Sequence, residues 1–193
     1  MTEKRSRNKT ARTLCYIAVA TAILSVCAWI ALPIGEIPVT LQTFALCLLA
    51  GLLGVKNAIA FTAAYLLLGF IGVPVFSGFT GGIAKLFSPT GGFLIGFLFS
   101  APLIACLCKR AERRKGIFAY LQTGAGMTAG ILLCFATQTV WTAILSAQAG
   151  TAVGIGSIIT VYVLPYLPFE LLKIITASVL TVRLKRKNMG AGI

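Results

Sequence analysis

Residues 91–115 read GGFLIGFLFSAPLIACLCKRAERRK, and this stretch contains the two signals that define the fold class. Its first part, residues 91–108, has no charged residue. It is close in length to the roughly 20 apolar residues that cross the hydrocarbon core of a bilayer. Its second part, residues 109–115, holds five cations in seven positions. An apolar run that ends in a basic cluster is typical of a membrane helix that ends at the cytoplasmic surface.

The composition of the whole chain also indicates an integral membrane protein. The 193 residues are 58% hydrophobic and only 11% charged, which is more apolar side chain than a soluble domain of this length can bury. The chain has 17 Lys and Arg against four Asp and Glu. In a soluble protein this excess would suggest nucleic-acid binding, but here the cations lie in short clusters between apolar runs. We therefore expect a lipid membrane as partner and no nucleic acid.

Five further apolar runs, separated by glycine, proline or charged residues, accompany residues 91–108. We predict an all-α integral membrane protein, a bundle of six transmembrane helices that forms a single membrane domain over residues 1–193. The predicted spans are about 14–34, 41–54, 57–72, 91–108, 119–147 and 157–182. The connections on one side of this bundle carry 15 of the 17 cations. We therefore expect a multi-pass protein of the plasma membrane with both termini in the cytoplasm.

The sequence lacks the groups that several classes of protein need. Without any histidine, Ser-His-Asp catalysis, zinc-hydrolase sites and haem ligation are disfavoured. The six cysteines lie in or at the ends of apolar runs, where thiols behave as small hydrophobic groups. No phosphate-binding G-x-x-x-x-G-K-[ST] loop occurs, so the energy for any transport must come from a gradient or a partner. We expect no metal and no cofactor on this chain.

Glu170 and Lys173 are the only carboxylate and ammonium groups within the predicted spans. Their i, i+3 spacing puts them on one helix face, in the outer half of the membrane. Ionisable groups inside a membrane are costly and usually functional, and Pro165 and Pro168 just upstream can break the helix and open a cavity. The pair suits an amide-like or ureido solute. A structural ion pair that satisfies itself is the alternative.

Two polar stretches at the outer side are further candidates for ligand contact. Gln42 and Thr43 begin the second span. Thr90 is a candidate N-cap, and Gly91 and Gly92 after it would let a ligand approach the first helix N–H groups. Ordinary glycines at a helix start are the alternative.

Four other features stay open between a functional and a structural interpretation. Phe79 and its neighbouring phenylalanines form either an apolar lid or anchors at the membrane interface. Gln138 serves either interhelical hydrogen bonding or ligand contact. Lys85, the only cation of the outer connections, either attracts an anionic solute or is simply solvated. Ala18-x-x-x-Ala22 has the small-residue spacing that lets another helix approach closely, which nominates a surface for a partner.

Three ordered motifs resemble the BioY family, the biotin-binding S components of energy-coupling factor (ECF) transporters. They are IPVTLQT at 37–43, GVPVFSGF at 72–79 followed by Gly81-Gly82, and PTGGFLIGF at 89–97. The segment Pro168-x-Glu170-x-x-Lys173 is similar as well, although the family usually has aspartate at position 170. Phe93 stands where many members carry tyrosine.

The resemblance implies a six-helix bundle of the ECF S-component type that is a transporter component and not an enzyme. Such a protein captures biotin outside and delivers it with a transmembrane T component and two cytoplasmic ATPase subunits, which alone use ATP. It also implies a T-component interface at Ala18 and Ala22. The implied biotin site comprises Gln42, Thr43, Phe79, Gly81, Gly82, Thr90, Gly91, Gly92, Glu170 and Lys173. The alternatives are an S component for another vitamin, a membrane enzyme with Glu170 as base, and a purely structural subunit.

Overall fold

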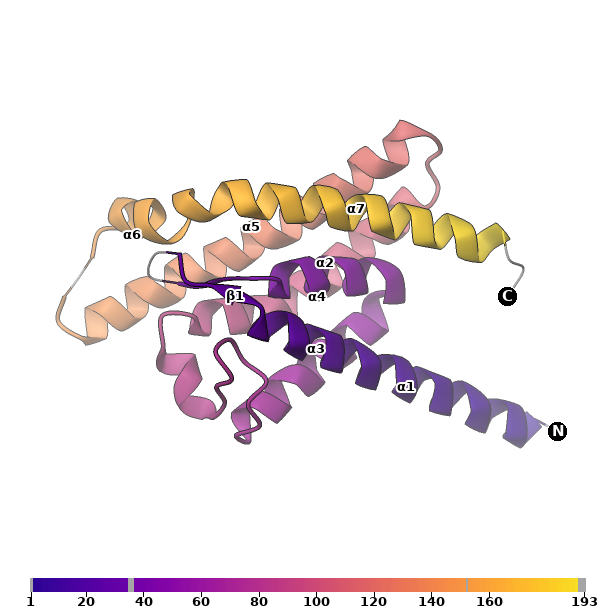
Figure 1. Ribbon diagram of the computed structural model, residues 1–193, viewed down its shortest axis with the longest axis horizontal. Coiled ribbons are helices and arrows are strands. Elements are labelled where there is room, and N and C mark those ends of the chain that lie inside the picture. Colours follow the sequence, from indigo (N-terminus) through magenta and orange to yellow (C-terminus); the bar gives the residue numbers. More distant parts are fainter. Residues whose placement is uncertain (1, 35–36, 152, 191–193) are drawn as a thin grey trace.

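The computed structural model describes residues 2–34, 37–151 and 153–190, and side chains over 10–34, 37–151 and 153–187. Nearly all of this chain is helical (Figure 1). In chain order the elements are α1 Thr2–Trp29, β1 Ala31–Leu32, β2 Val39–Thr40, α2 Gln42–Leu53, α3 Val55–Phe70, the 3₁₀ helix η1 Ile83–Phe87, α4 Gly91–Ala111, α5 Ile117–Gln148, α6 Ile155–Tyr162, the 3₁₀ helix η2 Leu164–Tyr166 and α7 Leu167–Gly190.

Among the described residues, four helical runs are long and apolar enough to cross a membrane. They are Thr10–Trp29, Gly91–Ala111, Ile117–Gln148 and Ile155–Lys187, the last formed by α6, η2 and α7 together. α2 and α3 are shorter apolar helices. The 12 residues of α2 extend over about 18 Å, less than the roughly 30 Å hydrocarbon core. With α6, η2 and α7 counted as one, the described residues form six apolar helices, four of them long, and the predicted all-α fold is confirmed.

The first helix ends at Trp29 and not at the predicted Ile34. Residues 31–32 instead pair with residues 39–40 in a short antiparallel ladder. The N–H of Leu41 donates to the carbonyl of Ile30 at 3.2 Å and continues this pairing. The hydrophobic run continues past Trp29, so hydropathy alone does not mark the helix end. The chain leaves the helix to make a pairing with residues further along the sequence.

The last span is interrupted where its two prolines lie. α6 ends at Tyr162, η2 covers the next turn, and α7 begins at Leu167. Pro168 lies in the first turn of α7, where a missing N–H costs no helix hydrogen bond. This break lets α6 change direction away from α7 (Figure 1).

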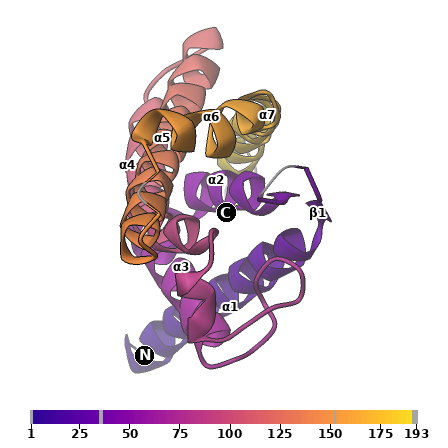
Figure 2. The same ribbon diagram turned by 90° about the vertical axis from the view of Figure 1, so that its left-hand side faces the viewer.

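α2 lies at the centre of the bundle and contacts α1, α3, α4, α5 and α7 (Figure 2). Most of its residues are buried, and three of these, Ala45, Ala50 and Gly51, are small enough to let neighbouring helices approach. The N-terminal end of α1 and the C-terminal end of α7 lie at one end of the molecule, together with the α4–α5 connection (Figure 1). The β1–β2 pair, η1 and α6 lie at the opposite end.

Candidate functional site

A cavity of about 60 Å³ lies at the end of the bundle where β2, η1 and α6 gather. It is enclosed by the β1–β2 connection and the starts of α2, α4 and α7, with further side chains from η1, α5 and η2. The lining residues are Ile37, Pro38, Val39, Thr40, Gln42, Thr43, Phe76, Ser77, Lys85, Thr90, Phe93, Leu94, Phe97, Phe135, Tyr166, Glu170 and Lys173. Segments far apart in the sequence therefore converge on one enclosed space.

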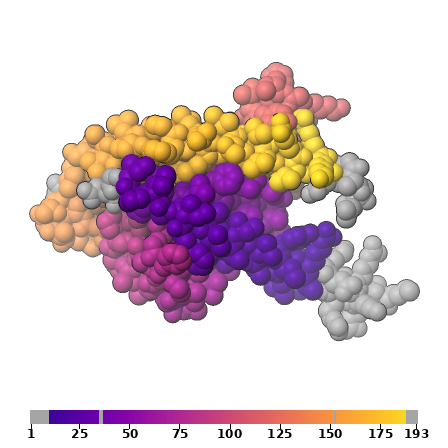
Figure 3. Space-filling model, viewed as in Figure 1, coloured from indigo at the N-terminus to yellow at the C-terminus, as the bar shows by residue number. Residues whose placement is uncertain are grey.

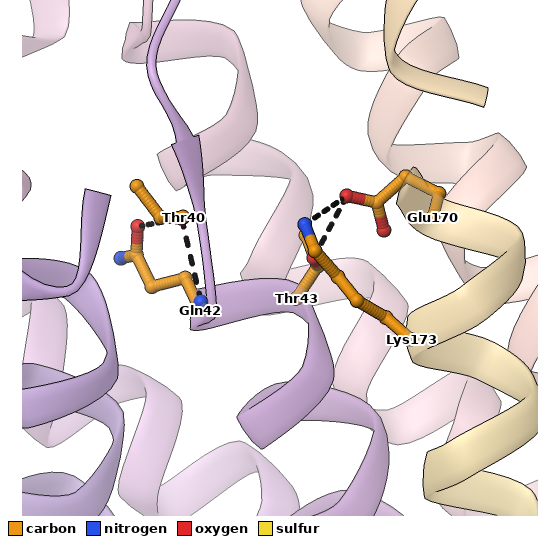
Figure 4. A network of polar contacts seen from close by, with 5 residues as sticks. All are labelled: Thr40, Gln42, Thr43, Glu170 and Lys173. Atoms are coloured by element: carbon orange, nitrogen blue, oxygen red, sulfur yellow. Dashed lines mark hydrogen bonds and ion pairs between the residues drawn. The ribbon is translucent and has the colours of Figure 1, made fainter. Parts of the chain in front are cut away.

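Three buried side chains in the wall of this cavity form a closed polar network (Figure 4). The ammonium of Lys173 donates to Glu170 Oε1 at 2.6 Å and to Thr43 Oγ1 at 3.1 Å. The Thr43 hydroxyl in turn donates to the same Glu170 oxygen at 2.9 Å. The network joins α2 to α7 and stabilises both charges away from water.

Two polar atoms in the cavity wall are buried without a hydrogen-bond partner among the described residues. They are Glu170 Oε2 and Ser77 Oγ. A buried carboxylate oxygen without a partner is energetically costly. Glu170 can therefore accept a hydrogen bond from a ligand while its other oxygen stays paired with Lys173.

Gln42 connects the cavity wall to α3 and to the connection after it. Its side-chain amide donates to the Tyr65 hydroxyl, which donates to the carbonyl of Val75 at 3.1 Å. At the start of α2, the backbone N–H of Gln42 donates to Thr40 Oγ1 at 3.3 Å (Figure 4). These bonds fix the first turn of α2 beside the cavity.

Aromatic rings make the rest of the wall largely apolar. Phe93 of α4 meets Phe135 of α5 edge to face, with ring centroids 5.6 Å apart. The Tyr166 hydroxyl donates to the carbonyl of Ile34 at 3.1 Å and accepts from the N–H of Ile37 at 3.0 Å. Tyr166 therefore holds the β1–β2 connection over the cavity. Tyr166 was not among the predicted site residues, although its place between Pro165 and Pro168 is a usable signal.

Five of the ten residues of the predicted ligand site line this cavity: Gln42, Thr43, Thr90, Glu170 and Lys173. The other five, Phe79, Gly81, Gly82, Gly91 and Gly92, do not line it. Their contact with a ligand stays a prediction.

Gly91 and Gly92 lie where α4 packs closely on its neighbours. A Cβ on Gly91 would come within 1.8 Å of the carbonyl oxygen of Leu86, and one on Gly92 within 2.6 Å of Gln138 Cα. The N–H of Phe93 is bound by Gln138 Oε1 at 3.0 Å. Both glycines thus permit close packing at the start of α4. Gln138 of α5 makes an interhelical hydrogen bond, which is one of the two roles predicted for it.

Phe79, Gly81 and Gly82 belong to the connection between α3 and η1. Phe79 stacks on Trp29 at the end of α1, with ring centroids 4.9 Å apart. Gly82 has a φ of 95°, which favours glycine, and its N–H donates to Gly69 of α3 at 2.7 Å. These residues hold the connection against α1 and α3.

Three other residues singled out by the sequence have defined places in the structure. Lys85 of η1 lines the cavity and is one of two cations that do so, with Lys173. Ala18 and Ala22 lie on the exposed face of α1. That face is open to close approach by another helix.

Comparison with known proteins identifies the family of this chain. The model of the family described as BioY matches residues 1–189. The chain belongs to the BioY family. This confirms the resemblance seen in the motifs, and it makes the chain a member of a transporter family and not an enzyme.

BioY relatives match this chain over most of their length. The biotin transporter BioY of Thermotoga maritima is 35% identical over 175 residues, which cover 91% of this chain and 96% of the relative. The probable biotin transporter BioY of Pyrococcus horikoshii is 33% identical over 175 residues, which cover 91% and 97% of the two chains. A crystal structure of the S-component for biotin from an ECF-type ABC transporter has a TM-score of 0.79. It is 28% identical, and the match covers 93% of each chain, which confirms the S-component fold.

Replacing Thr43 with valine tests whether the buried network of this BioY chain stabilises the fold. Thr43→Val removes the hydroxyl that both Glu170 and Lys173 contact. We expect the free energy of unfolding to fall by about 1–3 kcal/mol, because a buried charged pair loses a partner. Thermal unfolding of the detergent-solubilised chain measures this change.

Thr176→Val is the matched control for this experiment. Thr176 is an exposed residue of α7 whose hydroxyl binds only its own helix, at the carbonyl of Leu172. We expect the melting temperature of Thr176→Val to stay near that of the unmodified chain. Equal melting temperatures for the two variants would show that the network does not stabilise α2 against α7.

Proposed function

We propose that this chain is the membrane S component of an ECF-type biotin transporter, and that the cavity beside Glu170 and Lys173 is its biotin site. The observation that most strongly supports this proposal is a buried ion pair in the wall of a largely apolar cavity, in a chain of the BioY family. One carboxylate oxygen of this pair has no hydrogen-bond partner among the described residues. Biotin has a ureido ring with two N–H donors and a carbonyl, an apolar thiophane ring and a carboxylate tail. The cavity offers a complement to each part.

The ureido ring of biotin suits the open oxygen of Glu170. Its N–H groups are the only N–H donors that biotin has, and Glu170 Oε2 is the buried acceptor without a partner. Lys173 has three N–H donors and uses two of them, on Glu170 and Thr43. The third can donate to the ureido carbonyl. This pairing places the ureido ring beside α7.

The apolar rings of the cavity suit the thiophane ring and the aliphatic part of the tail. Phe93, Phe97 and Phe135 face the same space as the ion pair. Lys85, which comes from η1 and not from α7, is then the cation available to the carboxylate at the other end of the ligand. The ion pair and Lys85 thus bind opposite ends of biotin in this proposal.

Biotin binding requires that the cavity widen. Its volume of about 60 Å³ is below the roughly 300–1,000 Å³ of ligand sites. The connection between α3 and α4 contributes Phe76, Ser77 and Lys85 to the wall, and η1 is the one helix within it. We propose that this connection opens to admit biotin and closes over it.

Both termini lie in the cytoplasm in our proposal, and the chain is a single membrane domain. The support is the charge asymmetry of the connections and the position of the N-terminal end of α1 and the C-terminal end of α7 at the same end of the molecule as the α4–α5 connection (Figure 1). The biotin cavity then faces the outer side of the plasma membrane.

Delivery of biotin requires partners that supply energy, because this chain has no Walker loop. We propose that these are a transmembrane T component and two cytoplasmic ATPase subunits. The exposed face of α1 around Ala18 and Ala22 is the proposed surface for the T component, since small residues let helices approach closely.

Replacing Lys173 with alanine tests the biotin site directly. Lys173→Ala removes a buried donor and leaves Glu170 without its ion-pair partner. We expect the affinity for biotin to fall by about 10- to 100-fold, the range of a hydrogen bond to a charged group. Calorimetric titration of the purified chain in detergent, with desthiobiotin and thiamine as comparison ligands, measures this loss.

Lys56→Ala is the control, because Lys56 is an exposed cation at the start of α3 outside the cavity. It should bind biotin as the unmodified chain does. Unchanged biotin affinity in Lys173→Ala would remove the ion pair from the site. If the unmodified chain binds thiamine tightly and does not bind biotin, it is an S component for another vitamin.

Replacing Lys85 with glutamine tests which end of biotin it meets. If Lys85 attracts the carboxylate, Lys85→Gln should weaken biotin binding by about two- to fivefold, as a partly exposed charge pair does. The neutral analogue biotinamide should bind the variant and the unmodified chain equally. Equal weakening for both ligands would show that Lys85 does not recognise the carboxylate.

Enlarging the small residues of α1 tests the partner surface separately from the biotin site. Ala18→Leu/Ala22→Leu should abolish biotin uptake by cells that express the other subunits while leaving biotin affinity unchanged, because bulky side chains hold a partner helix away. Uptake of radiolabelled biotin and calorimetry give the two readings. The control is Ala125→Leu/Ala136→Leu on the exposed face of α5. Full uptake by the α1 variant would contradict the proposed interface.

A further inference from the structure

A second cavity, of about 460 Å³, lies at the end of the bundle that contains the α4–α5 connection and the C-terminal half of α7. It is bounded by the end of α4, the α4–α5 connection, the start of α5 and residues 181–186 of α7. None of its lining residues lines the biotin cavity. Along α7, Lys173 and Thr181 are about 12 Å apart. This volume falls within the range of ligand sites, and the biotin function does not use it.

The rim of the second cavity is strongly basic. Arg114, Lys115, Lys185 and Arg186 line it, against the single carboxylate of Glu112. Glu112 is already paired with Lys185, at 2.7 Å. Two of the cations, Arg114 and Lys115, make no ion pair or side-chain hydrogen bond within the described part of the chain. The rim therefore keeps positive charge that no group in the described part of the chain neutralises.

The inner part of the second cavity is apolar with one uncommitted hydroxyl. Ala111, Ala119 and Val182 line it and are buried. Thr181, which is 1% exposed, also lines it, and its hydroxyl has no hydrogen-bond partner among the described residues. The other two such atoms, on Ser77 and Glu170, lie in the biotin cavity. A cationic rim around an apolar interior matches an amphipathic anion.

The surface next to the rim indicates that this anion comes from the membrane. Phe118 and Leu121 of α5 are 67% and 61% exposed, and Leu184 of α7 is 40% exposed. Large apolar side chains so exposed on a membrane helix face lipid. Figure 3 shows the α4–α5 connection projecting beside the C-terminal half of α7. Lipid molecules therefore lie along these helices next to the rim. Basic pockets between membrane helices suit the anionic headgroups of such lipids.

We propose that the second cavity binds the headgroup of one anionic phospholipid. Arg114 and Lys115 bind its phosphate, and the apolar interior receives the glycerol and the first part of an acyl chain. The bound lipid bridges the α4–α5 connection and the end of α7. It fixes the two segments relative to each other at the membrane surface.

Native mass spectrometry of the full chain tests this proposal. The chain is released from micelles that hold equal amounts of phosphatidylglycerol and phosphatidylcholine, and the population that retains one lipid is measured. We expect one phosphatidylglycerol to be retained in preference to phosphatidylcholine. Arg114→Gln/Lys115→Gln should reduce this preference by at least about fivefold, since one basic residue near an anionic lipid contributes about this factor.

The matched control is Lys109→Gln/Arg110→Gln, which removes the same charge from the same basic cluster but lies outside the cavity lining. It should keep the preference of the unmodified chain. A second variant, Ala119→Leu, fills the apolar interior without any change of charge and should also lose the lipid. The melting temperature of each variant shows that it is folded.

Three outcomes would overturn the proposal. Equal loss of lipid in both double variants would mean a diffuse basic surface. Displacement of the lipid by inorganic phosphate at millimolar concentration, in a parallel measurement, would mean a site for a small anion. Equal retention of the two lipids by the unmodified chain would show that the cavity does not select an anionic lipid. An acidic segment of a protein partner would then be its ligand.

Discussion

The ion pair of Glu170 and Lys173 constrains the whole arrangement of the bundle. A carboxylate and an ammonium placed in an apolar span cannot face lipid, since neither group would be solvated there. α7 must therefore turn this face inward, where Thr43 of α2 completes the network. The same rotation directs Leu171, Leu172 and Ile175, each more than half exposed, to the outside. One pair of charges thus fixes which side of α7 belongs to the core.

The contact between α2 and α7 extends from one cavity to the other. Thr43 and Lys173 meet in the wall of the cavity at the start of α2. At the other end of α2, a Cβ on Gly51 would lie 3.0 Å from the Thr181 side chain, at the floor of the second cavity. A short central helix made largely of small and apolar residues allows this close contact. Each end of the interface then opens into a space lined by uncompensated polar groups.

The features that the sequence predicted are those set by local composition. Apolar runs marked the helices, and Glu170 and Lys173 stood out because they interrupt such a run. Features that depend on contacts between distant segments escaped prediction. Trp29 ends its helix because the following residues pair with residues 39–40, and Tyr166 reaches the cavity only through the packing of η2. The role of Gly91 and Gly92 likewise depends on a contact between distant segments, because both lie where α4 packs on α5.

The sequence separation within the polar network bears on how the protein is made. Thr43 and Glu170 are 127 positions apart, so the first enters the membrane long before the ribosome has synthesised the second. During that interval α2 has its neighbours α1, α3, α4 and α5 but not the helix that binds its first turn. The network therefore closes only when the last span has been inserted. A chain truncated anywhere before α7 lacks this network, so an intact network shows that synthesis has reached the last span.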